Sequence, residues 1–313
     1  MNNNTRTARL ITWLKSPLRA KQYSILIRAL CAARQFDGEL LREAYFDSLD
    51  PEREFSIANR GNEKYVVLNS DRGISKILFV KGSFDFDKVE KALSIMKTTN
   101  RRFKLETLID IGANIGTVCI PAIKRGLAAS AVAFEPEPLN HRVLVANVFL
   151  NDLADKINVY NLALGAENNQ TLRFELLPGS GEHRVYTADE SESPSEHPKK
   201  LTTVKSETFD SIVPAVDKCS HLVWMDTQGY EGIILQGARK ITQGKVPTVI
   251  EFWPEGMKRM GSYLALKTAM LNYSEYYDLA APNPRPIKIS DASIDNLYGQ
   301  LGEVGHWTDI LLV

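Results

Sequence analysis

Two acidic residues and a glycine-rich turn offer the clearest chemistry in this sequence. Asp110 lies in an apolar run that leads into Gly112, Asn114 and Gly116, and Glu135 ends the next apolar run. Glycine lets the backbone turn tightly and approach a ligand closely. A carboxylate at the end of the following strand can accept hydrogen bonds from both hydroxyls of a ribose. This combination predicts an α/β protein that binds an adenosine-type cofactor.

Two classes of cofactor compete for this pattern. Dinucleotide sites usually read G-x-G-x-x-G, so that the amides of a helix N-terminus hold a pyrophosphate. Here the spacing is G-x-x-x-G, and Asn114 occupies the turn. S-adenosylmethionine has no phosphate, and its amino-acid end suits Asp110, Asn114 and backbone groups. The spacing therefore favours S-adenosylmethionine, with a dinucleotide or a generic strand–turn–helix joint as the alternatives.

Four motifs in a fixed order resemble the FkbM family of S-adenosylmethionine-dependent methyltransferases, most of which methylate oxygen. They are Asp110-Ile-Gly-Ala-Asn-Ile-Gly116, Phe134-Glu-Pro136, Asn161-Leu-Ala-Leu-Gly165 and Asp226-Thr-Gln-Gly-Tyr-Glu231. The resemblance covers about residues 60–255. One departure matters: the fourth motif of relatives usually reads Asp-x-Glu-Gly-x-Glu, and this chain has Gln228 in place of the first Glu.

The motifs also indicate which residues bind S-adenosyl-L-methionine. We expect Glu135 on the ribose, and Ala163 and Leu164 beside the adenine, where a strand end needs small apolar neighbours. The full set of expected cofactor-binding residues is Asp110, Gly112, Asn114, Gly116, Glu135, Pro136, Ala163 and Leu164.

Methyl transfer to a hydroxyl benefits from a general base. Asp226 is the first candidate because it ends a predicted strand at the switch point of the sheet, although its carboxylate could instead cap the next helix. His183, beside flexible glycines, is the second candidate, although a lone loop histidine is more often solvated. Glu231 and Glu251 could join Asp226 around Mg²⁺, but no spacing is diagnostic of a metal, and we assign none.

The apolar runs predict the elements that position these residues. Strands are expected over 107–111, 131–134, 157–161, 222–225 and 248–252, with an extra alternating strand over 170–176. Helices are expected over 116–125, after Pro136 or Pro138, and from about Tyr230 to Lys240.

Two further strand-like runs near the C-terminus decide the fold class. They span 276–280 and 307–313, and a polar connection with several prolines separates them. Inserting the last strand antiparallel distinguishes a methyltransferase sheet from a dinucleotide-binding sheet. We therefore expect a Rossmann-like class I methyltransferase fold, α/β, with a mostly parallel seven-stranded sheet whose last strand is antiparallel.

Residues 1–60 are expected to form an N-terminal helical accessory segment, and residues 61–313 the methyltransferase domain, whose core motifs span 105–255. A helix is expected over 18–35, and only basic charges precede Asp37. This arm could lie on an anionic membrane or, the favoured alternative, pack on the domain or on a second subunit of a homo-oligomer. A hairpin is expected from the runs 65–68 and 74–80.

Composition agrees with a soluble, cytoplasmic enzyme. The 313 residues are 44% hydrophobic with a formal net charge of zero, which argues against general nucleic-acid binding. No apolar stretch is long enough to span a membrane, and the N-terminus lacks a signal-peptide pattern. Two functions remain open: an O-methyltransferase acting on a glycan, a lipid-linked sugar or a secondary metabolite, and a non-catalytic module that binds the cofactor or acts as a scaffold.

Overall fold

The computed structural model describes residues 38–50, 54–187 and 200–313, which belong to two compact units. The first unit ends at Phe84 and also includes Pro178–Gly181, and the second contains Asp85–Leu177 and Glu182–Val313. The basic helix expected over 18–35 lies outside the described residues. Its contact with a membrane or a second subunit stays a prediction, as does the domain boundary after residue 60.

The first unit combines a hairpin with two helices. Its elements are α3 (Gly38–Asp47), β1 (Phe55–Asn59), β2 (Lys64–Leu68) and α4 (Ile74–Lys81). β1 pairs with β2 in antiparallel register. The rings of Tyr45 and Phe46 on α3 lie against Phe79 of α4, with centroids 5.8 and 5.3 Å apart. Aromatic contacts at this spacing stabilise the pair of helices.

The expected hairpin of 65–68 with 74–80 is wrong, because residues 74–80 lie in helix α4. The carboxylate of Asp71 accepts the backbone N–H groups of Gly73 and Ser75, each at 2.9 Å, and so satisfies donors at the start of the helix. Gly82, with a φ of 85°, ends the helix in a left-handed conformation. The partner of β2 is instead β1, a strand that the sequence analysis did not assign.

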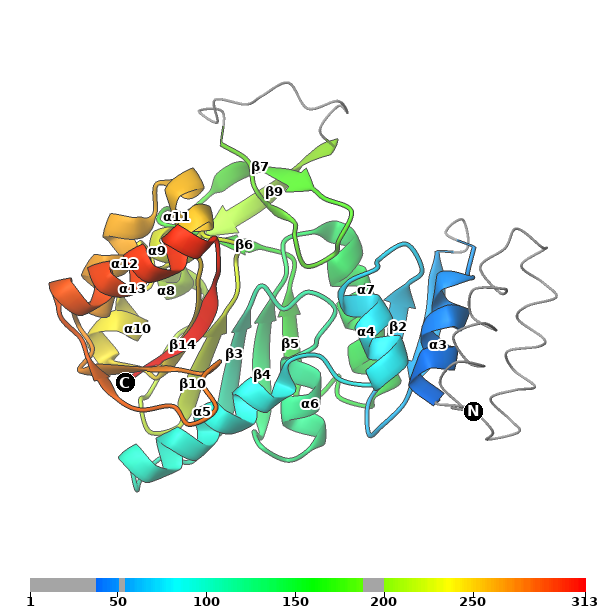
Figure 1. Cartoon of the computed structure of the whole chain (residues 1–313), viewed down its shortest axis with the longest axis horizontal. Helices are drawn as coiled ribbons and strands as arrows, with labels where there is room; N and C mark the ends of the chain where they lie inside the picture. The colour runs from blue at the N-terminus through cyan, green and yellow to red at the C-terminus, as the bar shows by residue number, and fades with distance from the viewer. Residues whose placement is uncertain (1–37, 51–53, 188–199) are drawn as a thin grey trace, which may run out of the picture. The chain divides into compact units, whose positions relative to one another are not determined.

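An eight-stranded sheet forms the centre of the second unit (Figure 1). Its order is β13-β12-β14-β11-β10-β3-β4-β5. The strands are β3 (Thr107–Ile111), β4 (Ser130–Phe134), β5 (Ile157–Tyr160), β10 (His221–Met225), β11 (Thr248–Phe252), β12 (Glu275–Asp278), β13 (Ile287–Lys288) and β14 (Thr308–Leu312). The pairs from β11 to β5 are parallel, and β14 is inserted antiparallel between β11 and β12. The expected fold class is confirmed, and the short β13 adds a strand at the edge beside β12.

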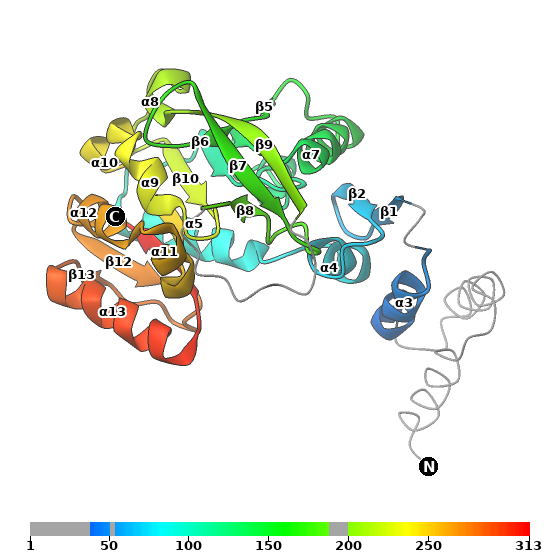
Figure 2. The same ribbon diagram turned by 90° about the horizontal axis from the view of Figure 1, so that it is seen from above.

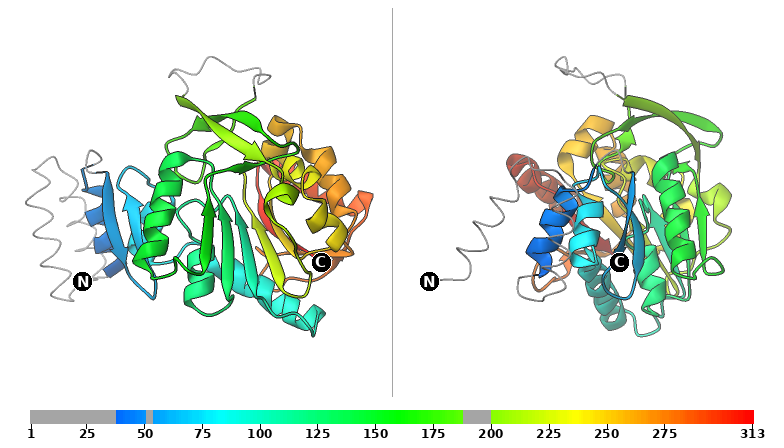
Figure 3. Two further views of the ribbon diagram at one scale, coloured as in Figure 1. Left: turned by 180° about the vertical axis from the view of Figure 1, so that it is seen from behind. Right: turned by 90° about the vertical axis from the view of Figure 1, so that its right-hand side faces the viewer.

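Helices cover both faces of this sheet. The cyan helix α5 crosses the face turned to the viewer in Figure 1, and the yellow helices lie over the other face, seen from behind in Figure 3 (left). The helices are α5 (Phe86–Thr99), α6 (Cys119–Lys124), α7 (Pro138–Leu150), α8 (Phe209–Ile212), α9 (Glu231–Gln236), α10 (Arg239–Gly244), α11 (Pro254–Met260), α12 (Tyr263–Met270) and α13 (Asp291–Val304). This double cover explains why β3, β10 and β11 are nearly continuous apolar runs.

The single helix expected from about Tyr230 to Lys240 is divided into α9 and α10. The division falls at Gly237, where a Cβ atom would lie 2.1 Å from the carbonyl oxygen of Gly165. The close approach of a loop at this point interrupts the helical pattern. No helix in the described ranges is long and apolar enough to cross a membrane.

A second, four-stranded sheet stands beside the carboxyl end of the main sheet, with the order β6-β9-β7-β8 (Figure 2). Its strands are β6 (Ala163–Leu164), β7 (Gln170–Leu176), β8 (Arg184–Val185) and β9 (Lys200–Glu207). The extra strand expected over 170–176 is confirmed as β7. A small apolar cluster, which includes Phe174, Val204 and Met260, packs around this sheet.

Candidate functional site

Six residues lie at one level of the main sheet, at the edge where its parallel strands end. Ile111 pairs with Phe134 and Met225, Met225 with Ile250, and Phe134 with Tyr160, so the residues that follow them stand side by side. Asp309 of β14 joins the row because it pairs with Glu251. We call this set the edge row: Asn161, Glu135, Gly112, Asp226, Glu251 and Asp309. Neighbouring strands lie about 4.8 Å apart, so the acidic side chains of the row are close together.

The glycine-rich turn is held by contacts within the protein. Gly112 has a φ of 85°, and a Cβ atom there would lie 2.0 Å from the carbonyl oxygen of Asp226. Gly116 has a φ of 95°, and a Cβ atom there would lie 2.5 Å from the Cδ1 of Ile120. Their spacing in the sequence predicts that both glycines lie beside a ligand. The structure shows that they also allow the turn to pack against the neighbouring strand and helix.

Both expected cofactor-binding acids accept backbone hydrogen bonds. Asp110, 1% exposed, accepts the N–H of Cys119 on Oδ2 at 3.0 Å. Glu135, 5% exposed, accepts the N–H groups of Asn114 and Glu137 on its two oxygens, each at 2.8 Å. Each carboxylate oxygen has a second lone pair, so Glu135 can accept further donors. Glu135 therefore fixes the turn around Asn114, which has a φ of 50°, and keeps the capacity to bind hydroxyls.

Gln228 joins two carboxylates of the edge row. Its Nε2 donates to Oδ1 of Asp226 at 3.0 Å and lies 3.3 Å from Oε2 of Glu251. Asp226 is half-buried, whereas Glu251 is 8% exposed. The departure from the family pattern at position 228 thus has a visible consequence, because an amide donor stands between the two acids.

The turn after Asp226 is fixed from several sides. Oε1 of Glu231 accepts the backbone N–H and the hydroxyl of Thr227, at 2.8 and 2.9 Å. Arg259 donates to the carbonyl oxygen of Gln228 at 2.8 Å, and its guanidinium lies 4.8 Å from the centre of the Trp253 ring. Gly229 has no room for a side chain, because a Cβ atom would lie 2.3 Å from Gly256. These contacts hold Gln228 at a φ of 59°.

Lys88 and Asp309 belong to the site but were missed by the sequence analysis. Lys88, on the first turn of α5, lies 2.6 Å from Oδ2 of Asp309 and 2.7 Å from Oδ2 of Asp85. Asp309 could have been noticed as the acid inside the apolar run of β14. Lys88 gives no such signal, because Asp309 lies far from it in the sequence.

Burial raises the pKa of the acids around the edge row. It raises the pKa of Asp110 to about 7, that of Glu135 to about 8 and that of Asp226 to about 6. Burial raises the pKa of Glu251 well above its usual value, and the negative charge of Asp226 raises it further. Removing a carboxylate from water disfavours its charged form. A positive charge bound beside these acids would stabilise their ionised forms, so the edge row is better suited to a positively charged ligand than to an anion.

The structure places the other expected site residues as follows. Ala163 and Leu164 form β6; Ala163 belongs to the small apolar cluster, and Leu164 to the main core. The backbone oxygen of Pro136 accepts a hydrogen bond from Nδ2 of Asn161 at 3.0 Å. This bond joins the segments that follow β4 and β5. Nδ1 of His183 accepts the N–H of Leu177 at 3.0 Å, between β7 and β8. The roles of these residues stay predictions.

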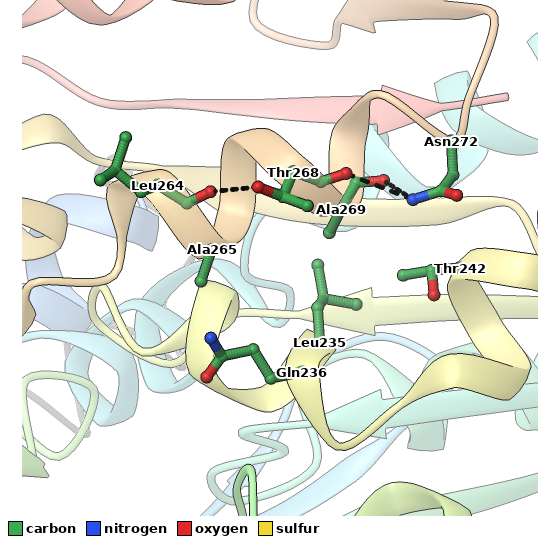
Figure 4. A pocket seen from close by; sticks show the side chains of 8 residues that line it. All are labelled: Leu235, Gln236, Thr242, Leu264, Ala265, Thr268, Ala269 and Asn272. Carbon is green, nitrogen blue, oxygen red and sulfur yellow. Dashed lines mark hydrogen bonds between the residues drawn. The ribbon is translucent and has the colours of Figure 1, made fainter.

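Two other candidate sites receive no support from the described part of the chain. Its His, Cys, Asp and Glu residues form no group of three or more that could hold a metal ion. A surface hollow between α9, α10 and α12 contains none of the expected site residues (Figure 4). Two polar side chains that line it donate to backbone oxygens of α12: Thr268 to Leu264 at 2.8 Å, and Asn272, which follows the helix, to Ala269 at 3.1 Å. The edge row is therefore the candidate functional site.

Comparison with known proteins identifies a family. The profile of the methyltransferase FkbM domain matches residues 110–268, which include every edge-row residue except Asp309. A search of curated proteins found no match.

Three solved structures are similar to this chain at low sequence identity. A methyltransferase FkbM from Methylobacillus flagellatus has 16% identity and a TM-score of 0.39, over 92% of this chain and 58% of its own. TYW2 from P. horikoshii, in complex with MeSAdo, has 14% identity and a TM-score of 0.40, over 83% and 70%. TYW2 from M. jannaschii, in complex with AdoMet, has 12% identity and a TM-score of 0.40, over 83% and 84%. This chain therefore spans less than two thirds of the Methylobacillus protein.

We predict that Gly112→Ala is far more damaging than Gly126→Ala. Both glycines have positive φ, but a Cβ atom at Gly126 meets nothing within 4 Å. Gly126→Ala should cost about 1–2 kcal/mol of the free energy of unfolding, from backbone strain alone. Gly112→Ala adds a clash with the backbone of Asp226 and should cost at least about 3 kcal/mol. Urea denaturation of both variants measures the difference. Equal losses would contradict the close approach of the turn to Asp226.

Proposed function

The chain belongs to the FkbM methyltransferase family, and from this premise we propose that it transfers a methyl group from S-adenosylmethionine to a hydroxyl. The proposed acceptor is a small molecule or a glycan, such as a lipid-linked sugar or a secondary metabolite. The single observation that supports this function best is the edge row. It combines a glycine-rich turn, buried acids and a half-buried carboxylate at the ends of adjacent parallel strands, where ligands bind in open α/β sheets.

The residues at this edge fit the proposed cofactor. Glu135 has free acceptor capacity at the end of β4, which suits the two ribose hydroxyls. Asp110 lies in the strand before the glycine-rich turn, where its charge would attract the ammonium group. Asn114 and the backbone of the turn would bind the carboxylate end. Ala163, Leu164 and Pro136 remain the residues that we propose near the adenine and the ribose.

The charge of the site supports S-adenosylmethionine over a dinucleotide. Its sulfonium and ammonium groups are positive, so they would stabilise the ionised forms of Asp110 and Asp226. The pyrophosphate of NAD would instead be repelled by those acids.

The proposed reaction is an in-line displacement. The cofactor, when bound, supplies an activated methyl group on a positively charged sulfur. The protein orients the acceptor, and Asp226 accepts the hydroxyl proton as the oxygen attacks the methyl carbon and the carbon–sulfur bond breaks. Asp226 is suited to this step because it is half-buried and stands beside the glycine-rich turn. The proton can then pass from Asp226 to solvent.

We predict that Glu135→Ala weakens S-adenosylmethionine binding about ten- to hundredfold, because two ribose hydroxyls lose their hydrogen-bond acceptor. Calorimetric titration measures the dissociation constant. Glu137→Ala is the matched control, since Glu137 is also buried and also accepts a backbone N–H, that of Asn140, at 2.6 Å. This control should lose stability and keep its affinity. Equal affinities in wild type and Glu135→Ala would contradict the assignment, as would measurable NAD binding.

The catalytic proposal is tested by turnover with methyl-labelled S-adenosylmethionine and a panel of glycans and hydroxylated small molecules. Label transfer is expected from wild type, and Asp226→Asn should lower the rate about 10²–10⁴-fold with little change in cofactor affinity. The Asn side chain keeps the shape and loses the basicity. If Asp226 only caps the turn, Asn serves nearly as well and the rate stays unchanged. That result would move the search for a base to His183, and cofactor binding without transfer to any acceptor would favour a non-catalytic module.

A further inference from the structure

Asp226 is hydrogen-bonded to Gln228, which also contacts Glu251, and neither neighbour has a role in the proposed reaction. Nε2 of Gln228 donates to Asp226 at 3.0 Å and to Glu251 at 3.3 Å, so one amide group joins the two carboxyl groups. Asp226 and Gln228 follow β10, and Glu251 lies near the end of the adjacent parallel strand β11. Two acids that share one amide donor cannot both be ionised without a large electrostatic cost.

We propose that Glu251 and Gln228 are positioning residues for Asp226: Glu251 keeps its proton and donates it to the Asp226 carboxylate, and Gln228 donates an N–H to the same carboxylate. This inference rests on the proposed function, in which Asp226 is the general base. Two donors on one carboxylate would hold it in a single orientation while leaving acceptor capacity for the hydroxyl of the substrate.

The neighbours of Glu251 explain why it keeps the proton. Glu251 is 8% exposed, so burial disfavours its charged form. The negative charges of three other acids raise the pKa of Glu251: Asp226, which follows β10, Glu231 of α9 and Asp309 of β14. None of these favours a charge on Glu251.

The neighbours of Asp226 act in the opposite direction. Burial raises its pKa and Asp309 adds to this, but the donors Gln228 and Glu251 and the positive charge of Lys88 lower it. The charge of Asp226 also interacts with those of Asp110 on β3 and Glu231 on α9. Lys88 is itself bound to Asp309, which brings one positive charge from α5 to this end of the row. Asp226 is therefore the member of the pair that ionises first.

The test uses the two forms of the cofactor as charge probes. S-adenosylmethionine has a positive sulfur and S-adenosylhomocysteine a neutral one, so the ratio of their affinities reports the charge on Asp226. Calorimetric titrations between pH 5 and 9 should show the preference for S-adenosylmethionine rising about tenfold as Asp226 ionises. The pH midpoint of this rise is the quantity compared between variants.

Three variants separate a positioning role from a structural one. Glu251→Gln keeps a donor, so the midpoint should stay within about 0.3 pH units of wild type. Glu251→Leu fills the space without a donor, and Gln228→Glu adds a third acid, so both should raise the midpoint by about one pH unit. Glu255→Gln is the control, because Glu255 is an exposed acid just beyond β11. It should leave the midpoint unchanged.

Failure of the positioning roles of Glu251 and Gln228 can be told apart from failure of the proposed function. A midpoint that falls in Glu251→Gln would show that Glu251 is ionised in wild type and would overturn the inference. A midpoint that is the same in wild type, Glu251→Leu and Glu251→Gln would overturn it as well, and this pair decides the matter even if Gln228→Glu does not fold. If wild type binds neither form of the cofactor, the proposed function fails and this inference fails with it.

Discussion

The concentration of carboxylates at one level of a parallel sheet is the constraint on which the rest of the site depends. Asp226, Glu251 and Asp309 occupy adjacent strands, and Glu135 stands two strands away from Asp226. Buried carboxylates are unfavourable unless they are hydrogen-bonded or paired. Each of these acids meets that requirement differently. Glu135 accepts backbone N–H groups, Asp309 binds Lys88, and Asp226 and Glu251 share the amide of Gln228.

The topology of the sheet creates this concentration. Parallel strands bring their carboxyl ends to the same edge, so residues far apart in sequence follow one another along the row. β14 contributes to the same edge because it runs antiparallel, and Asp309, near its start, faces Glu251 near the end of β11. The inserted strand therefore does more than complete the sheet. It brings both an acid and, through Lys88 on α5, a positive charge to the candidate site.

Local patterns in the sequence predicted much of the fold and part of the site. Apolar runs located β3, β7 and β11 at their observed bounds, and motif order indicated Asp110, Glu135 and Asp226. Contacts between distant residues could not be predicted in the same way. The bridge from Gln228 to Glu251 and the ion pair of Lys88 with Asp309 depend on strand order and side-chain direction. The error at α4 has a local cause, since Ile74–Val80 suits a strand until Asp71 caps its first N–H groups.

The central claim is that the edge row is a site for a positively charged cofactor, and proton release on binding tests it most directly. Burial raises the pKa of Asp110 to about 7, that of Glu135 to about 8 and that of Asp226 to about 6, so these acids are partly protonated near neutral pH. A positive ligand favours their ionised forms and lowers these pKa values, which expels protons. Calorimetry of S-adenosylmethionine binding at pH 7, in Tris and in PIPES, should give enthalpies that differ by the release of roughly one proton. Binding with the same enthalpy in both buffers would contradict the claim.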